Sequence, residues 1–160
     1  MSKNTNDIQL KIANRKPVQV SFEELIEHLP QPPKGWIAEK FQGETIFLGN
    51  YSISQVSQIY TQQSKQITIR IFDWAFNSAL YTPFLMTTDF SQESTEGYNK
   101  SIKIDNISGK EYTYSSKRSL NLLVYNKFFV QIEAIKIEKT ELREWWQLVD
   151  YKSLIKLNNN

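Results

Sequence analysis

Alternating apolar and polar residues are clearest from Glu111 to Ile137, where the chain reads EYTYSSKRSLNLLVYNKFFVQIEAIKI. Successive side chains of a β-strand point to opposite faces, so residues two apart share a face. The residues that share a face are Tyr112 and Tyr114, then Leu120, Leu122 and Val124, then Phe128, Val130, Ile132 and Ala134. We predict three antiparallel strands, joined by turns at Ser115–Ser119 and Tyr125–Phe128, as the spine of a sheet.

The opposite faces of these strands are also apolar, because they carry Leu123, Phe129 and Ile135. A strand that is apolar on both faces is usually covered on both sides. We therefore expect helices on at least one face of the sheet and apolar material on the other.

A helix is predicted to begin at Ser21. Ser21 and Glu24 have the spacing of a capping box, in which each side chain bonds the other residue's backbone N–H. Val20 and Leu25 stand at the two positions of a hydrophobic staple. Pro30 ends this helix, since proline lacks the backbone N–H that a helix interior needs.

Short alternating runs and turn residues define the remaining elements. The predicted strands are Ile8–Ala13, Trp36–Phe41, Thr45–Leu48, the hairpin Tyr51–Thr61 with Gln66–Trp74, and Ser101–Ile107. The predicted turns and loops are Gln42–Gly43, Asp89–Asn99 and Ser108–Gly109. The predicted helices are Asn77–Thr88, with Pro83 inside it, and a last helix with Thr140 as N-cap. In the first hairpin strand the alternation changes phase, which indicates a bulge near Ser54–Gln55 or partial cover of both faces.

Clustered strands with separated helices predict an α+β fold, a mainly antiparallel β-sheet with helices packed on it. With helices on both faces the fold is a three-layer sandwich. The chain is expected to form a single domain over 1–160, with disordered ends at 1–7 and 158–160.

Composition and charge exclude several functions. The apolar share of 40% is that of a globular protein, and a net charge of +2 gives no basic stripe, so we expect no nucleic acid partner. The chain has no cysteine, which removes thiolate chemistry and disulfides. No apolar run is long enough for a transmembrane segment. The start shows no secretory signal, so the sequence as written predicts a cytoplasmic protein, or an exported one if a leader has been removed.

The sequence offers no catalytic constellation. Its one histidine, His28, falls in the last turn of the first helix, where we expect a partly exposed side chain favoured by the helix dipole rather than a base or ligand. Five scattered glycines form no phosphate loop. Asp89, Glu93 and Glu96 do not match an EF-hand loop. We predict no catalytic residue, no metal, no cofactor and no enzymatic activity.

Aromatic residues are the enriched class and supply two candidate sites. Trp74, Phe84 and Tyr98 could line a pocket at the end of the sheet, with Asp73 and Glu96 at its rim. The alternative, which we favour, is that these aromatics fill the interface between helix and sheet.

The adjacent pair Trp145–Trp146 is the second candidate. Neighbouring residues lie about 100° apart around a helix, so both can be buried only if the helix is broadly covered. An exposed member would mark a contact surface. Burial of both against the sheet is the reading we favour.

The order of elements resembles that of the Mog1/PsbP-like α/β/α sandwich proteins, many of them uncharacterised bacterial proteins. The residues that carry the resemblance are Pro32-Pro33-Lys34-Gly35-Trp36, the hairpin Tyr51–Trp74 and the segment Leu142–Trp146, within Gln31–Leu157. The resemblance implies a fold and non-enzymatic binding or assembly roles. It transfers no catalytic residue.

Three functional hypotheses follow. The first is a non-catalytic binding or accessory module that contacts a protein partner through the sheet end or the last helix. The second is a small-molecule or lipid carrier that uses the aromatic pocket. The third is an enzyme of unknown class, which would need a buried carboxylate or lysine with a strongly shifted pKa in a cleft.

Overall fold

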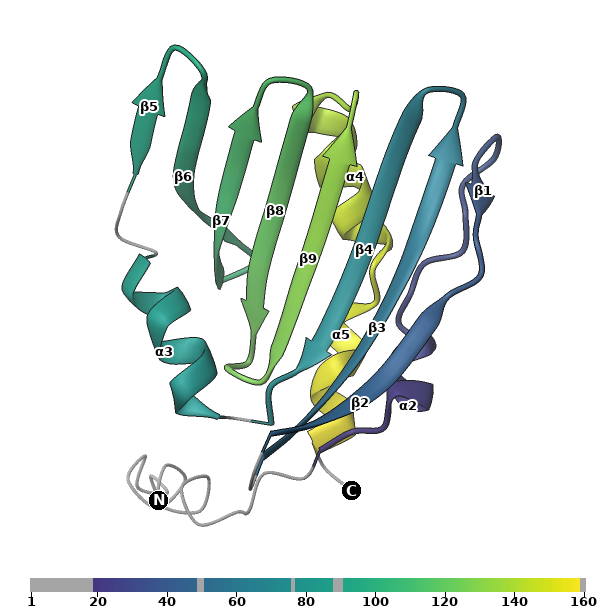
Figure 1. Ribbon diagram of the computed structural model, residues 1–160, viewed down its shortest axis with the longest axis vertical. Coiled ribbons are helices and arrows are strands. Elements are labelled where there is room, and N and C mark those ends of the chain that lie inside the picture. The colour runs from purple at the N-terminus through teal and green to yellow at the C-terminus, as the bar shows by residue number, and fades with distance from the viewer. Residues whose placement is uncertain (1–18, 49–50, 76, 88–90, 159–160) are drawn as a thin grey trace, which may run out of the picture.

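The computed structural model describes residues 19–48, 51–75, 77–87 and 91–158. These residues form the predicted α+β fold, an antiparallel sheet with helices packed against it (Figure 1). The predicted strand Ile8–Ala13 and the segment 1–7 lie outside the described residues. Asn158, expected in a disordered tail, instead ends the 3-10 helix η1 (Ile155–Asn158).

Nine strands are described, and each described pairing between them is antiparallel. In chain order they are β1 (Ile37–Ala38), β2 (Gln42–Leu48), β3 (Tyr51–Gln62), β4 (Lys65–Asp73), β5 (Gln92–Ser94), β6 (Gly97–Ile104), β7 (Ile107–Tyr114), β8 (Lys117–Val124) and β9 (Phe128–Ile135). Their order across the sheet is β1-β3-β4-β9-β8-β7-β6-β5, and β2 also pairs with β3. The predicted meander is confirmed as β7, β8 and β9, near the centre of the sheet.

The core lies between one face of the sheet and the helices α2 (Phe22–Ile26), α4 (Lys139–Leu148) and α5 (Tyr151–Leu154) (Figure 1). Alternate residues of the central strands point into it and are fully buried. These residues include Ile67, Ile69 and Ile71 of β4, Leu120, Leu122 and Val124 of β8, and Phe128, Val130 and Ile132 of β9. The predicted shared face of the meander is therefore the core face.

The opposite face of the sheet is covered only in part. Helix α3 (Ser78–Thr87) lies beside the ends of β7 and β8 rather than over the strands (Figure 1), and it contacts this face through Phe84, whose ring meets that of Phe129 edge to face at 5.2 Å. Leu123, on the same face, is buried. Apolar cover of both faces is thus confirmed at this end of the sheet. No other described helix contacts this face. We call the part of it away from α3 the helix-free face.

Two predicted features of the first half are wrong. Gln42–Gly43 is no turn but the start of β2, and a Cβ on Gly43 would lie 2.5 Å from a ring carbon of Phe22, so the glycine allows close packing. There is no bulge at Ser54–Gln55, because the register with β4 continues through both residues. The change of phase in the alternating pattern instead reflects partial cover of both faces of β3, because Ile53 and Val56, on opposite faces, are both buried.

Two predicted connections in the second half are also wrong. The polar loop Asp89–Asn99 contains the hairpin of β5 and β6, whose outer strand is exposed and therefore lacks an apolar pattern. The turn before β7 is formed by Asp105 and Asn106, both with positive φ (49° and 64°), a conformation that Asp and Asn tolerate. Ser108–Gly109 belongs to β7 instead.

The helix ends follow local chemistry with small shifts. The capping box of Ser21 and Glu24 is confirmed, but α2 ends at Ile26, before Pro30. The last helix begins two residues earlier than predicted, with Glu138 rather than Thr140 at the N-cap. Among the described helices, none has the length and apolar character that a membrane crossing requires.

Candidate functional site on the helix-free face

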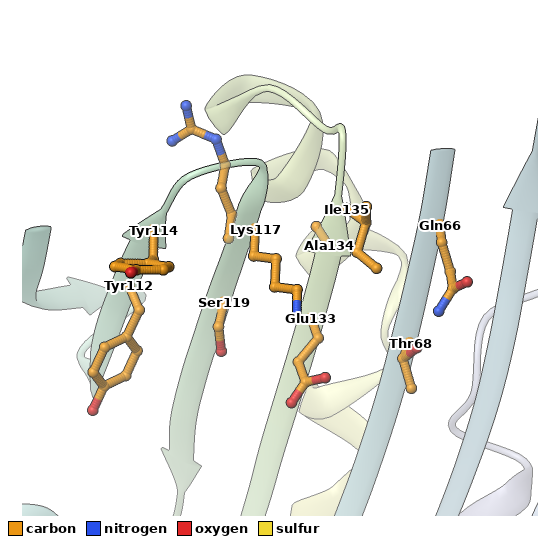
Figure 2. A pocket seen from close by; sticks show the side chains of 10 residues that line it. Gln66, Thr68, Tyr112, Tyr114, Lys117, Ser119, Glu133, Ala134 and Ile135 are labelled. Atoms are coloured by element: carbon orange, nitrogen blue, oxygen red, sulfur yellow. The ribbon is translucent and has the colours of Figure 1, made fainter. Parts of the chain in front are cut away.

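A hollow of about 290 Å³ opens on the helix-free face, near the β7–β8 turn. Four neighbouring strands, β4, β9, β8 and β7, supply its lining (Figure 2). The lining residues are Gln66, Thr68, Tyr112, Tyr114, Lys117, Arg118, Ser119, Glu133, Ala134 and Ile135. In Figure 2 the tyrosines stand at one end, Gln66 and Thr68 at the other, and Lys117 and Glu133 between them.

Strand register explains why a hollow forms here. Directly opposed residues of neighbouring strands share a face, and one such row runs Thr68, Glu133, Ser119 and Tyr112. Ser119 is the shortest side chain of this row and lies between Glu133 and Tyr112. The floor of the hollow is therefore low at Ser119 and the walls are high on both sides.

Tyr112 and Tyr114 are the aromatic wall. They alternate along β7 with residues that point to the other face, and they are 37% and 59% exposed. A tyrosine hydroxyl is protonated at neutral pH and can donate a hydrogen bond, and burial raises the pKa of Tyr112 further. Each ring offers an apolar face together with a polar tip, which suits contact with another molecule.

The charged residues in and beside the hollow differ in whether they have an ion-pair partner. Arg70, just below the lining, lies 3.2 Å from the Glu133 carboxylate and donates a hydrogen bond to Gln131 at 3.2 Å. In the part of the chain that the structure describes, Lys117 has no carboxylate at ion-pair distance. The Arg118 guanidinium is engaged outside the hollow, where it donates to the Ile137 carbonyl at 3.0 Å and to the Thr113 hydroxyl at 3.1 Å. Among the described cations of the lining, Lys117 is thus the one whose charged group is left available to a bound molecule.

Of the predicted pocket residues, the structure brings Trp74 and Phe84 together but leaves Tyr98 apart. Trp74 stacks on Phe129, with ring centroids 4.5 Å apart, and Phe84 meets the same ring. Tyr98 points to the other face of the sheet, where its hydroxyl donates to the Glu111 carboxylate at 2.6 Å. The three aromatics do not line one pocket.

The two predicted rim carboxylates are also separated. Asp73 is fully buried at the end of β4, where its carboxylate lies 3.5 Å from the Lys127 ammonium. Burial raises the pKa of Asp73, against the lowering effects of Lys127 and of the Val20 backbone N–H. Glu96 is exposed in the β5–β6 turn, at the far end of the sheet. These residues have separate surroundings and share no rim.

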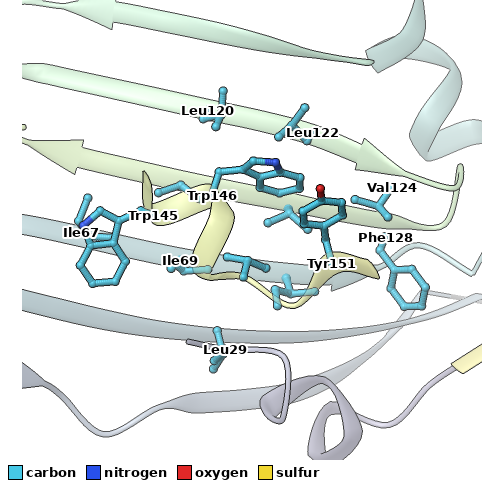
Figure 3. Packing of buried hydrophobic residues seen from close by; sticks show 14 of the residues in the cluster. Leu29, Ile67, Ile69, Leu120, Leu122, Val124, Phe128, Trp145, Trp146 and Tyr151 are labelled. Carbon is cyan, nitrogen blue, oxygen red and sulfur yellow. The ribbon is translucent and has the colours of Figure 1, made fainter. Parts of the chain in front are cut away.

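Trp145 and Trp146 are both buried, at 2% and 0% exposure, so the reading in which one indole is exposed is wrong. Trp145 packs against Trp36 and Tyr60, whereas Trp146 stacks on Tyr151 at 4.4 Å (Figure 3). The core covers α4 over a wide arc, which accommodates both indoles. This pair therefore provides no contact surface.

His28 is buried rather than partly exposed, at 6%. Its Nδ1 lies 2.9 Å from the carbonyl oxygen of Asp150, which joins the end of α2 to the α4–α5 junction. This contact gives a partner to one ring nitrogen of the single histidine in the sequence. Among the described residues, no group of three or more His, Asp or Glu side chains could hold a metal ion.

Sequence reasoning missed the hollow because its lining comes from strands that are distant in the chain. It placed Tyr112 and Tyr114 on a shared face, which was the one available signal.

Comparison of the chain with protein-family models, curated proteins and solved structures gives no match. The assignment of a function therefore depends on the geometry described above.

Proposed function

We propose that the protein is a non-catalytic binding module that contacts a protein partner through the helix-free face of its sheet. The observation that carries the proposal is the exposure of Tyr112 and Tyr114 beside the hollow, on a part of the face that none of the described helices covers. Tyrosine is enriched at protein interfaces, where its ring supplies contact area and its hydroxyl a hydrogen bond.

The size and shape of the hollow favour a protein over a small molecule. Sites for small molecules usually enclose about 300–1,000 Å³ and cover most of the ligand. This hollow, at about 290 Å³, lies at the lower limit and is open to solvent along the sheet. Trp74 and Phe84 pack on Phe129 and Tyr98 faces the other way, so the aromatic carrier pocket has less support.

The resemblance to Mog1/PsbP-like proteins is part of the proposal. Helix α3 flanks one corner of the sheet, where Phe84 packs on Phe129, on the face opposite α2, α4 and α5. This contact supports a sandwich whose third layer is limited to one corner of the sheet and whose second face is open at the hollow. A binding role on such a scaffold needs an accessible face, which the open end provides.

Site-specific photo-crosslinking in the source cells tests the proposal. A benzophenone amino acid is placed at Tyr112, at Tyr114, or at Tyr125, which is a matched control because it is 41% exposed in the β8–β9 turn, away from the hollow. We expect one discrete crosslinked protein from positions 112 and 114 and none from 125. Equal crosslinking from Tyr125, or none from the hollow, contradicts the proposal.

A further inference from the structure

We infer that the hollow binds an extended, acidic peptide segment of the partner, whose carboxylates pair with Lys117 while its backbone crosses Tyr112 and Tyr114. This inference rests on the proposed function and adds the chemistry of the partner to it. Three features of the hollow support it, namely its length, its charge and its hydrogen-bonding groups.

The length of the hollow suits a short extended segment. Its lining crosses four adjacent strands, from Gln66 and Thr68 on β4 to Tyr112 and Tyr114 on β7. With strands about 4.8 Å apart, the three intervals between them span about 14 Å. An extended chain covers this distance with about four residues, at roughly 3.3–3.6 Å per residue.

The charge of the hollow favours an anionic occupant. Glu133 is the carboxylate of the lining, and Arg70 lies 3.2 Å from it, so its charge is compensated within the face. Lys117 is exposed and lies in the middle of the hollow. Lys110, also on this face, is fully buried and makes contacts of its own, so it adds nothing accessible. An acidic side chain over Ser119 would give Lys117 its counter-charge.

The neutral residues of the lining suit a peptide backbone. An extended segment presents N–H donors and C=O acceptors that remain unpaired unless the binding surface supplies partners. Gln66 offers both a donor and an acceptor, the Tyr112 hydroxyl can act as either, and the Ser119 hydroxyl, which accepts from Asn121 at 3.0 Å, can donate. The tyrosine rings then cover the apolar parts of the segment. Backbone contacts give affinity, and Lys117 gives the preference for acidic sequences.

The test uses a displayed library of random linear peptides, selected on the full chain. Enriched peptides are synthesised with a fluorescent label, and their affinity is measured by polarisation at low and at high salt. We expect enrichment in Asp and Glu, and binding that weakens with salt. We also expect about tenfold weaker binding for Lys117→Glu. The matched control is Lys152→Glu, the same change on exposed Lys152 of α5, on the other face, which leaves affinity unchanged.

A double variant, Tyr112→Thr with Tyr114→Thr, separates the inference from the proposed function. Peptides that require the tyrosines but show no acidic enrichment and no effect of Lys117→Glu overturn the inference and leave the proposed function standing. If the selection gives no peptide whose binding depends on the tyrosines, both are overturned. Circular dichroism and urea unfolding establish that each variant is folded before its affinity is compared.

Discussion

The Asp73 carboxylate lies 3.5 Å from the Lys127 ammonium, and both side chains are withdrawn from solvent. Asp73 also accepts backbone hydrogen bonds from Val20 and Ala75, each at 2.7 Å, so it holds the chain before α2 and the turn after β4. Burial raises the pKa of Asp73 and lowers the pKa of Lys127. The attraction between the two charges opposes both shifts.

Removal of one partner should therefore be costly. We expect Lys127→Met to lower the free energy of unfolding by about 3–5 kcal/mol, since it leaves a buried carboxylate unpaired. Adding Asp73→Asn should recover part of the loss. Urea denaturation measures both effects. The control is Lys65→Met, which breaks an ion pair with Glu141 at 41% and 24% exposure and should cost about 1 kcal/mol or less. Equal losses for Lys127→Met and Lys65→Met would refute this account.

A pH dependence is expected from Glu111, which is buried where β7 faces α4. Burial by itself would raise the pKa of Glu111, but the Tyr98 hydroxyl and the Arg143 guanidinium, at 2.6 and 2.8 Å, outweigh it and lower the pKa. The folded protein therefore holds fewer protons on this group than the unfolded chain does. The stabilisation is complete above the ordinary pKa and is lost as the pH falls through the lowered value.

Glu111→Gln should remove this part of the acid sensitivity. We expect the variant to be less stable by about 2 kcal/mol near pH 6, because it loses charge-assisted hydrogen bonds. Between about pH 6 and pH 3 it should lose less stability than the wild type does. Urea unfolding across this range gives both quantities. Glu93→Gln is the control, because Glu93 is 71% exposed and should leave the pH dependence unchanged; parallel pH curves for wild type and Glu111→Gln would exclude this role.

Trp145 should be one of the most costly residues to truncate. Its ring lies 5.0 Å from that of Trp36 and 4.9 Å from that of Tyr60, so Trp145→Ala removes a shared aromatic contact and leaves a cavity. We expect a loss of about 3–5 kcal/mol, measured by thermal or urea unfolding. Leu148→Ala, on the same helix at 45% exposure, should change stability by about 0.5 kcal/mol or less. A small effect at Trp145 would mean that the core relaxes around it.

The tyrosines of the hollow should contribute little to stability. Tyr112→Thr and Tyr114→Thr keep residues that favour strands and remove side chains that are largely exposed. We expect the double variant to lose about 1 kcal/mol or less, measured by urea unfolding. A larger loss would assign these rings a structural role and would weaken the argument that they serve binding.

Local patterns predicted those parts of the fold that local interactions determine. The start of α2 was predictable because Ser21 and Glu24 bond each other's backbone three residues apart. The meander was predictable because alternation and a three-residue turn at 125–127, with φ of 54° at Tyr125 and at Asn126, lie within one segment. The hairpin β5–β6 was missed because exposed polar residues give a strand no apolar signal.

The candidate site was less predictable because it depends on strand order. Thr68 lies opposite Glu133 only because β4 pairs with β9, and nothing near either residue in the sequence indicates that pairing. Tyr98 was misplaced for the same reason. The alternating pattern shows which residues share a face with Tyr98, but it does not show which face of the sheet the helices cover. Trp145 and Trp146 are both buried because the core covers α4 over a wide arc. That cover depends on the tertiary structure and not on the local sequence.

The junction of β4 with β9 also bears on how fast the protein folds. Among the described strands, β5 to β9 pair in chain order, and β3 pairs with β4, so each half of the sheet can form from nearby contacts. Uniting them brings Asp73 against Phe128 and closes the whole segment from Trp74 to Lys127 into a loop. Closing this loop costs conformational entropy before the contacts between β4 and β9 can offset it. We expect refolding to be limited by this one meeting of distant strands, so that substitutions along β4 and β9 slow refolding, whereas those in β5 and β6 mainly hasten unfolding.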